Sequence, residues 1–108
     1  VQLCMGVPWG GPNDLNTFMA MVNNVPGDWH WSAFSIGRDQ MAYVAAAVLA
    51  GGHVRVGLED NLWLAKGELA TNEALVARAA GIITAMGGNI MGPDAVRAKL
   101  GLTKRAPK

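Results

Sequence analysis

The sequence predicts an α/β fold in which short buried strands alternate with helices around a parallel sheet. Strand-like apolar runs and helix-like apolar patterns alternate three times along the chain. Each strand-like run ends in a loop rich in glycine or charged residues. The 108 residues are 51% hydrophobic and only 16% charged, which excludes intrinsic disorder and favours a packed core. Strands that alternate with helices form parallel sheets with right-handed crossovers.

The first unit begins with the apolar run 2–7, which predicts a buried strand that leaves through the glycine-rich loop at Gly10-Gly11. Asn13 or Asp14 is suited to cap the next helix, because both side chains accept hydrogen bonds from free backbone N–H groups. Apolar residues at a spacing of three or four indicate that helix: Leu15, Phe18, Met19 and Val22.

The second unit repeats this order. Residues 29–36 are aromatic and partly alternating, which predicts a second strand with the exit loop Gly37-Arg38-Asp39. We expect Asp39 to cap an alanine-rich helix over residues 40–49. The pair Gly51-Gly52 follows directly and is typical of a helix end.

The third unit begins with residues 53–58, a predicted strand followed by Glu59-Asp60-Asn61. Thr71 is expected to cap a longer helix that ends at Gly87-Gly88. One face of that helix is apolar: Leu75, Val76, Ala79, Ile82, Ile83 and Met86.

Beyond the third unit, Pro93 is suited to begin a last short helix that Gly101 closes, and residues 103–108 form a polar, basic tail. A small doubly wound domain and part of a (β/α)₈ barrel both fit this order of elements. We favour the barrel, because the glycine pattern of dinucleotide-binding folds is absent after the first strand. The fold class is then α/β, with residues 1–102 forming the last three βα units of a TIM barrel plus a short C-terminal helix.

The start of the chain and its composition favour the same interpretation. The chain begins without Met, inside a predicted strand, as expected of a piece of a longer protein. Fourteen glycines and a low charged fraction predict a surface covered by the rest of a larger domain or by a homo-oligomer.

Charge and cysteine content exclude several classes of function. A formal net charge of +1 argues against binding to nucleic acid or to an anionic membrane. The longest apolar-rich stretch, residues 41–50, is too short to span a bilayer. The single cysteine, Cys4, excludes an internal disulfide framework and indicates a reducing compartment, so we expect a cytoplasmic protein.

The third predicted strand carries the residues best suited to chemistry. Side chains alternate along a strand, so Arg55, Gly57 and Glu59 share one face, which would point into the barrel. Asp60 follows at the strand end, within reach of the long Arg55 side chain. A structural ion pair is one interpretation. The other is a catalytic carboxylate pair, with one metal ligand and one acid/base, in which Arg55 sets the charge balance.

These residues belong to a longer pattern. Residues 51–61, Gly-Gly-His-Val-Arg-Val-Gly-Leu-Glu-Asp-Asn, resemble the signature of the β-keto acid cleavage enzymes, whose named member is the 3-keto-5-aminohexanoate cleavage enzyme. Residues 35–40 and 69–72 resemble the same family in order and spacing. The resemblance extends over residues 1–102.

The resemblance implies a zinc-dependent (β/α)₈ barrel that converts a β-keto acid and acetyl-CoA to acetoacetate and a new acyl-CoA. It implies that Glu59 is a zinc ligand, that Asp60 is the acid/base and that Arg55 polarises Asp60. Two histidines from an early strand would complete the zinc site. His30 and His53 do not form such a pair and are expected to be structural, so the remaining ligands would lie outside this chain.

The loops after the first two strands are candidates for binding CoA. Gly10 and Gly11 would let a phosphate or the CoA backbone approach closely, or they form a plain tight turn. Arg38 would bind a CoA phosphate, or it pairs with Asp39.

Two alternative functions stay open. The chain is a non-catalytic fragment that only self-associates, or it belongs to another metal-dependent barrel lyase or aldolase. The identity of the β-keto acid is not set by these residues.

Overall fold

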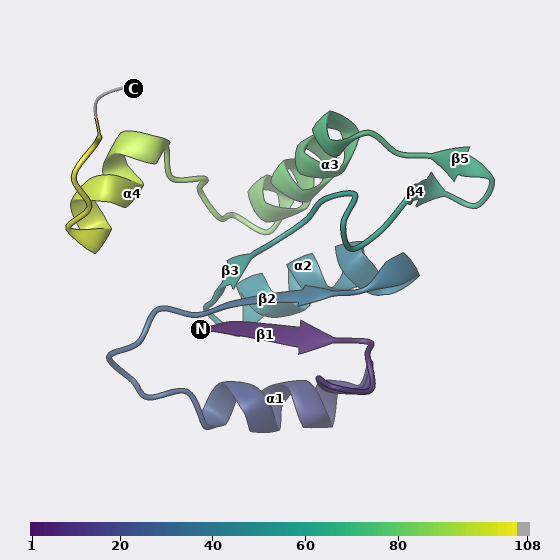
Figure 1. Cartoon of the computed structure of the whole chain (residues 1–108), viewed down its shortest axis with the longest axis horizontal. Helices are drawn as coiled ribbons and strands as arrows, with labels where there is room; N and C mark the ends of the chain where they lie inside the picture. Colours follow the sequence, from purple (N-terminus) through teal and green to yellow (C-terminus); the bar gives the residue numbers. More distant parts are fainter. Residues whose placement is uncertain (106–108) are drawn as a thin grey trace.

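The computed structural model describes residues 1–105 and shows a mixed α/β fold built on a parallel sheet (Figure 1). Strands β1 (Gln2–Met5), β2 (Ser32–Ser35) and β3 (His53–Val54) lie in the order β1-β2-β3. Cys4 pairs with Phe34 and Ser32 with His53, and both pairings are parallel. The predicted parallel α/β arrangement is therefore confirmed.

All three strands are shorter than the sequence predicts. Strand β1 ends at Met5 because Gly6, with φ +82°, turns the chain in a conformation that glycine adopts readily. Strand β2 begins at Ser32 rather than at residue 29 and ends at Ser35. Strand β3 pairs over two residues, and one further bond, from the Arg55 N–H to the Ala33 carbonyl (3.3 Å), extends the contact.

Helices α1 (Leu15–Asn23) and α2 (Gln40–Leu49) connect the strands. Asp14 caps α1, and its Oδ1 accepts bonds from the Asn16 and Thr17 N–H groups at 2.9 and 3.0 Å. Asp39 ends a 3-10 turn, η1 (Gly37–Asp39), and occupies the N-cap position of α2, as predicted. The prediction that its side chain caps the helix is wrong, because the side chain forms no hydrogen bond with the first turn of α2. Its carboxylate instead accepts a bond from Asn13 Nδ2 at 2.8 Å, which ties the first two exit loops together.

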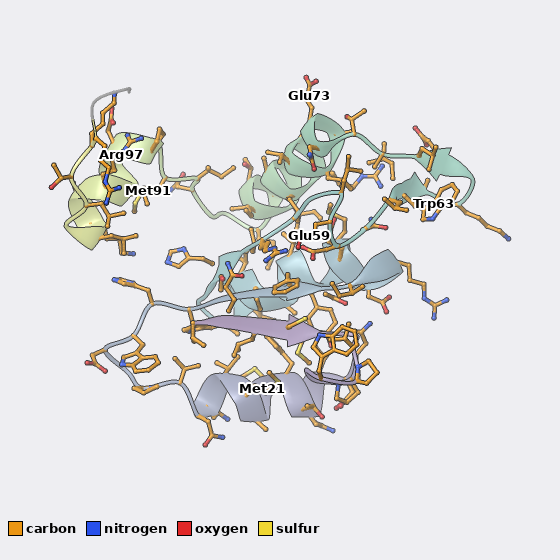
Figure 2. The ribbon with its side chains drawn as sticks, in the orientation of Figure 1. Met21, Glu59, Trp63, Glu73, Met91 and Arg97 are labelled. Atoms are coloured by element: carbon orange, nitrogen blue, oxygen red, sulfur yellow. The ribbon has the colours of Figure 1, made fainter. Side chains whose placement is uncertain are left out.

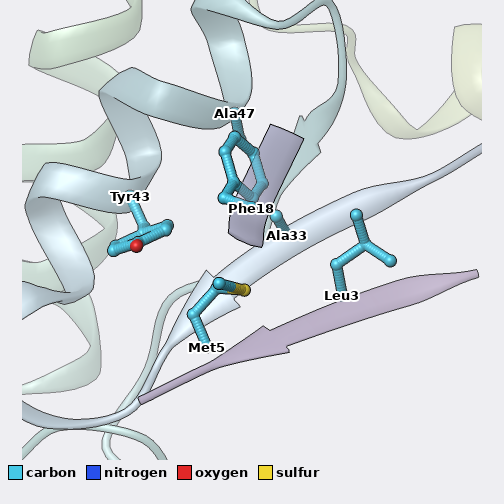
Figure 3. Close-up of a cluster of buried hydrophobic side chains, with 6 residues drawn as sticks. All are labelled: Leu3, Met5, Phe18, Ala33, Tyr43 and Ala47. Carbon is cyan, nitrogen blue, oxygen red and sulfur yellow. The ribbon is translucent and has the colours of Figure 1, made fainter. Parts of the chain in front are cut away.

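The core lies between one face of the sheet and these two helices (Figure 3). Phe18 of α1 and Tyr43 of α2 meet edge to face, with ring centroids 5.5 Å apart. The buried cluster comprises Leu3, Met5, Phe18, Ala33, Tyr43 and Ala47. Because side chains alternate along a strand, the opposite face of the sheet carries Gln2, Cys4 and Phe34.

Helix α3 (Asn72–Ala85) packs beside α2 and buries Leu75 and Ala79. Thr71 caps it as predicted, with Oγ1 accepting the Ala74 N–H at 3.1 Å. Helix α4 (Pro93–Leu100) begins at its proline, ends at Gly101 and lies to one side of the sheet (Figure 1). Of the predicted tail 103–108, residues 103–105 form no helix or strand, and 106–108 lie outside the described residues.

A hairpin that the sequence analysis does not predict precedes α3. Strands β4 (Trp63–Ala65) and β5 (Glu68–Leu69) pair antiparallel around a turn in which Gly67 has φ +80°. Trp63 lies on this hairpin, away from the parallel sheet (Figure 2). Within residues 1–105, no helix combines the length and the apolar character needed to cross a membrane.

Candidate functional site

Arg55 is the centre of a polar cluster at the end of β3. Its guanidinium forms a two-point pair with Asp60, with Nε 3.0 Å from Oδ2 and Nη2 3.2 Å from Oδ1. The same Nη2 lies 2.7 Å from Glu59 Oε2. The sequence-based expectation that Arg55 reaches Asp60 is confirmed, and the structure brings all three predicted residues into one contact network.

The two carboxylates differ sharply in exposure. The Asp60 side chain is 2% exposed, whereas that of Glu59 is 83% exposed. A buried carboxylate is costly unless a cation and hydrogen bonds compensate for its lost hydration. Asp60 therefore depends on Arg55, while Glu59 keeps a carboxylate that is open to solvent.

Two neighbouring strands fix the plane of the guanidinium. Its central carbon lies 4.4 Å from the centre of the Phe34 ring, which is a cation–π contact. Nη1 donates to Gln2 Oε1 at 3.2 Å. A planar group held at four points orients the Asp60 carboxylate more firmly than a flexible ammonium would. The sequence analysis missed both Gln2 and Phe34.

Cys4 lies on the same face of β1 as Gln2 and adjoins this cluster. Burial raises the pKa of the Cys4 thiol, the negative charge of Asp60 raises it further, and Arg55 opposes the increase. A raised pKa keeps the thiol neutral at pH 7. The Cys4 thiol is therefore a weak nucleophile at neutral pH.

The exit loop of β1 is held by contacts within the chain itself. A Cβ atom at Gly10 would lie 2.2 Å from the Cys4 carbonyl oxygen, and one at Gly11 would lie 2.8 Å from Met5 Cε. Gly10 therefore requires glycine for local packing alone, because its Cβ would overlap a backbone atom, whereas at Gly11 the neighbouring atoms belong to the flexible ends of methionine side chains. The contact of both glycines with CoA stays a prediction.

Arg38, the third residue predicted to contact CoA, lies on the neighbouring exit loop. Its side chain is 95% exposed, and its Nε lies 4.0 Å from Asp39 Oδ1. An exposed pair at that distance contributes little to stability, so the guanidinium is accessible to an anion. Its role in CoA binding also stays a prediction.

The histidines lie at the other end of the strands. His53 begins β3 and His30 precedes β2, with ring centroids 6.4 Å apart. Within the described part of the chain, no three metal-ligating side chains come together. The role of Glu59 as a metal ligand therefore stays a prediction.

Comparison with known proteins places the chain in a family. Residues 1–102 match the family described as beta-keto acid cleavage enzyme. The chain is 69% identical over 105 residues to the 3-dehydrocarnitine:acetyl-CoA trimethylamine transferase of Rhizobium meliloti (strain 1021), covering 97% of this chain and 35% of that protein. It is 40% identical over 85 residues to the 3-keto-5-aminohexanoate cleavage enzyme of Fusobacterium nucleatum subsp. nucleatum, covering 78% of this chain and 31% of that enzyme.

A third relative, the 3-oxoadipate:acetyl-CoA acetyltransferase of Cupriavidus necator, is 35% identical over 106 residues, which cover 94% of this chain and 37% of that protein. The chain belongs to the beta-keto acid cleavage enzyme family, and the resemblance drawn from residues 51–61 is confirmed. The chain spans about a third of the length of these relatives.

Proposed function

We propose that this chain forms the last three βα units of a β-keto acid cleavage enzyme with a (β/α)₈ barrel and carries its acid/base residue. The observation that carries the proposal is the buried Asp60 carboxylate, held at two points by Nε and Nη2 of Arg55 just past the end of a parallel strand. In parallel α/β folds the reactive groups gather at this end of the strands. Family membership supports the same reaction class.

The proposed reaction exchanges acyl groups between two substrates. A β-keto acid, R–CO–CH₂–COO⁻, and acetyl-CoA give acetoacetate and R–CO–CoA, so the acyl group R–CO moves to CoA and the CH₂–COO⁻ group moves to the acetyl carbon. The carbon–carbon bond that forms and the one that breaks both involve the CH₂ carbon. A base that takes a proton from this carbon, and later returns it, balances the whole cycle.

We assign that base to Asp60. Arg55 occupies one lone pair on each Asp60 oxygen, and each oxygen retains a second lone pair that can accept a proton. Burial keeps water away from this carboxylate, and the fixed guanidinium prevents it from rotating. A general base held in this way contributes about 10²- to 10⁴-fold to a rate.

Glu59 would hold the zinc ion that the resemblance implies. The donor set fits in part, because the Glu59 carboxylate is 83% exposed and Arg55 binds only its Oε2. A zinc ion bound here by Glu59 and two imidazoles from outside this chain would polarise the keto oxygen of the substrate. Arg55 would then limit the mutual repulsion of the two neighbouring carboxylates.

The substrates proposed follow from the relatives and from the exit loops. Acetyl-CoA is the proposed co-substrate, and Gly10, Gly11 and Arg38 are the residues proposed to contact its phosphates. The 69% identical relative is named for 3-dehydrocarnitine, which is therefore the first β-keto acid to test. We further propose a homo-oligomer, because apolar side chains are exposed on and next to the hairpin at Leu62, Trp63 and Leu69. The single cysteine supports a cytoplasmic location.

The test measures acetoacetate formed by the full-length protein from acetyl-CoA and a panel of β-keto acids, together with its zinc content. The proposal expects stoichiometric zinc and turnover that depends on both substrates. Turnover of a β-keto acid without acetyl-CoA would favour another metal-dependent lyase or aldolase. A folded, zinc-free protein without turnover on any acid would favour a non-catalytic role.

A further inference from the structure

The backbone turn that carries Glu59 and Asp60 is closed on a single carbonyl oxygen. The Gly57 carbonyl accepts the N–H groups of Asp60 and Asn61 at 3.2 and 3.1 Å. It also accepts a bond from Gln40 Nε2 at 3.1 Å. The amide of a distant helix is thus fixed to the oxygen around which residues 57–61 turn.

Gln40 makes this contact from a wholly buried position at the first residue of α2. Its other polar atom, Oε1, has no hydrogen-bond partner within the described residues. An unpaired buried amide oxygen destabilises a folded protein, and an apolar side chain of the same size avoids that penalty. A methionine would fill this space with less cost to stability, so the value of glutamine here lies in the bond to Gly57.

Two other contacts hold the turn from outside. The Gly37 N–H donates to the Asp60 carbonyl at 2.6 Å, and the Leu58 N–H donates to Asn72 Oδ1 at 2.8 Å. Arg55 fixes the carboxylate of Asp60, whereas these three contacts fix its backbone. Among them, only Gln40 reaches the carbonyl that closes the turn.

We propose that Gln40 is a positioning residue for the acid/base step of Asp60. This inference rests on the proposed function. The Gln40 amide holds the Gly57 carbonyl, the carbonyl holds the Asp60 N–H, and the Asp60 carboxylate therefore stays aligned with the carbon that it deprotonates. Catalysis is sensitive to such alignment, and a displacement of about 1 Å can lower a rate by about 10²-fold.

The test is Gln40→Met in the full-length protein, with Tyr43→Phe as the matched control. Tyr43 is also buried on α2, one turn further along, and its side chain forms no hydrogen bond with residues 57–61 in the described part of the chain. We expect Gln40→Met to lower kcat about 10- to 100-fold and to change KM for acetyl-CoA by less than about twofold. We also expect an equal or higher thermal midpoint, because the unpaired oxygen is removed, and normal kcat in Tyr43→Phe.

Amide hydrogen exchange supplies a second readout that does not depend on turnover. Exchange in residues 57–61 should be faster in Gln40→Met, while exchange in α2 and α3 stays unchanged. Normal kcat in Gln40→Met would overturn the inference, and so would a lower kcat accompanied by a lower thermal midpoint. If the wild-type protein converts no β-keto acid, the proposed function fails, and unchanged exchange in 57–61 would then also overturn the role of Gln40 in fixing the turn.

Discussion

Arg55→Met is the change that most directly measures what holds Asp60 in place. It removes both bonds to Asp60, the contact with Glu59 and the bond to Gln2. Removing one partner of a buried ion pair costs about 3–5 kcal/mol, because the remaining charge stays buried without a counter-charge. Since the Arg55 side chain is 31% exposed and water can partly replace it, we expect a loss of about 3 kcal/mol.

A double-mutant cycle assigns this loss to one of the two carboxylates. Arg55→Met combined with Asp60→Asn should show a coupling free energy of about 1–3 kcal/mol, since Asp60 is almost fully buried. Arg55→Met combined with Glu59→Gln should show less than about 1 kcal/mol, since Glu59 is exposed. The free energies come from urea unfolding of the full-length protein at pH 7. Equal coupling to both carboxylates would refute the reasoning.

Three further predictions concern residues around the site. Cys4 should react slowly with iodoacetamide at pH 8, and Asp60→Asn should speed that reaction by lowering the Cys4 pKa; a rate unchanged by Asp60→Asn would contradict the link. Gly10→Ala should destabilise the fold by about 1–3 kcal/mol in urea unfolding, because its Cβ would overlap the Cys4 carbonyl; a higher KM for acetyl-CoA at unchanged stability would instead assign Gly10 to the co-substrate. The hydroxyl of Thr17 lowers the pKa of Asp14. The stabilisation from this cap is therefore present above the usual Asp pKa and is lost as the pH falls through the lowered value. Asp14→Ala should lower the thermal midpoint more at pH 7 than at pH 2, and an equal decrease at both pH values would contradict this prediction.

The helices follow closely from the sequence because their ends are set by local chemistry. Thr71 caps α3, and Gly101 with φ +64° ends α4, as the residue types predict. The lengths of the strands do not follow from the sequence in this way, because a strand extends only as far as it pairs with the neighbouring strand. Residues 53–58 have the apolar pattern of a strand throughout, yet the strand that pairs with β2 covers only His53–Val54.

The contacts of the candidate site also differ in how far they can be predicted from the sequence. Arg55 and Asp60 are five residues apart, and the sequence predicts that Asp60 lies just past the strand end, within reach of the long Arg55 side chain. Alternation along the strand predicts only that Arg55 and Glu59 share a face. Gln2 is 53 residues from Arg55, and the contact of Gln40 with Gly57 spans 17 residues. Only the order of the strands brings such residues together, and nothing in their local sequence indicates it.

The central claim is that Asp60 is the acid/base of a β-keto acid cleavage reaction. Its most direct test is the rate of acetoacetate formation from acetyl-CoA and 3-dehydrocarnitine by the full-length Asp60→Asn protein, after zinc content and folding are shown to match the wild type. Asparagine keeps the shape of the side chain and removes its ability to accept a proton. We expect turnover to fall by about 10²- to 10⁴-fold. Turnover close to that of the wild type, in a fully zinc-loaded and folded variant, would contradict the claim.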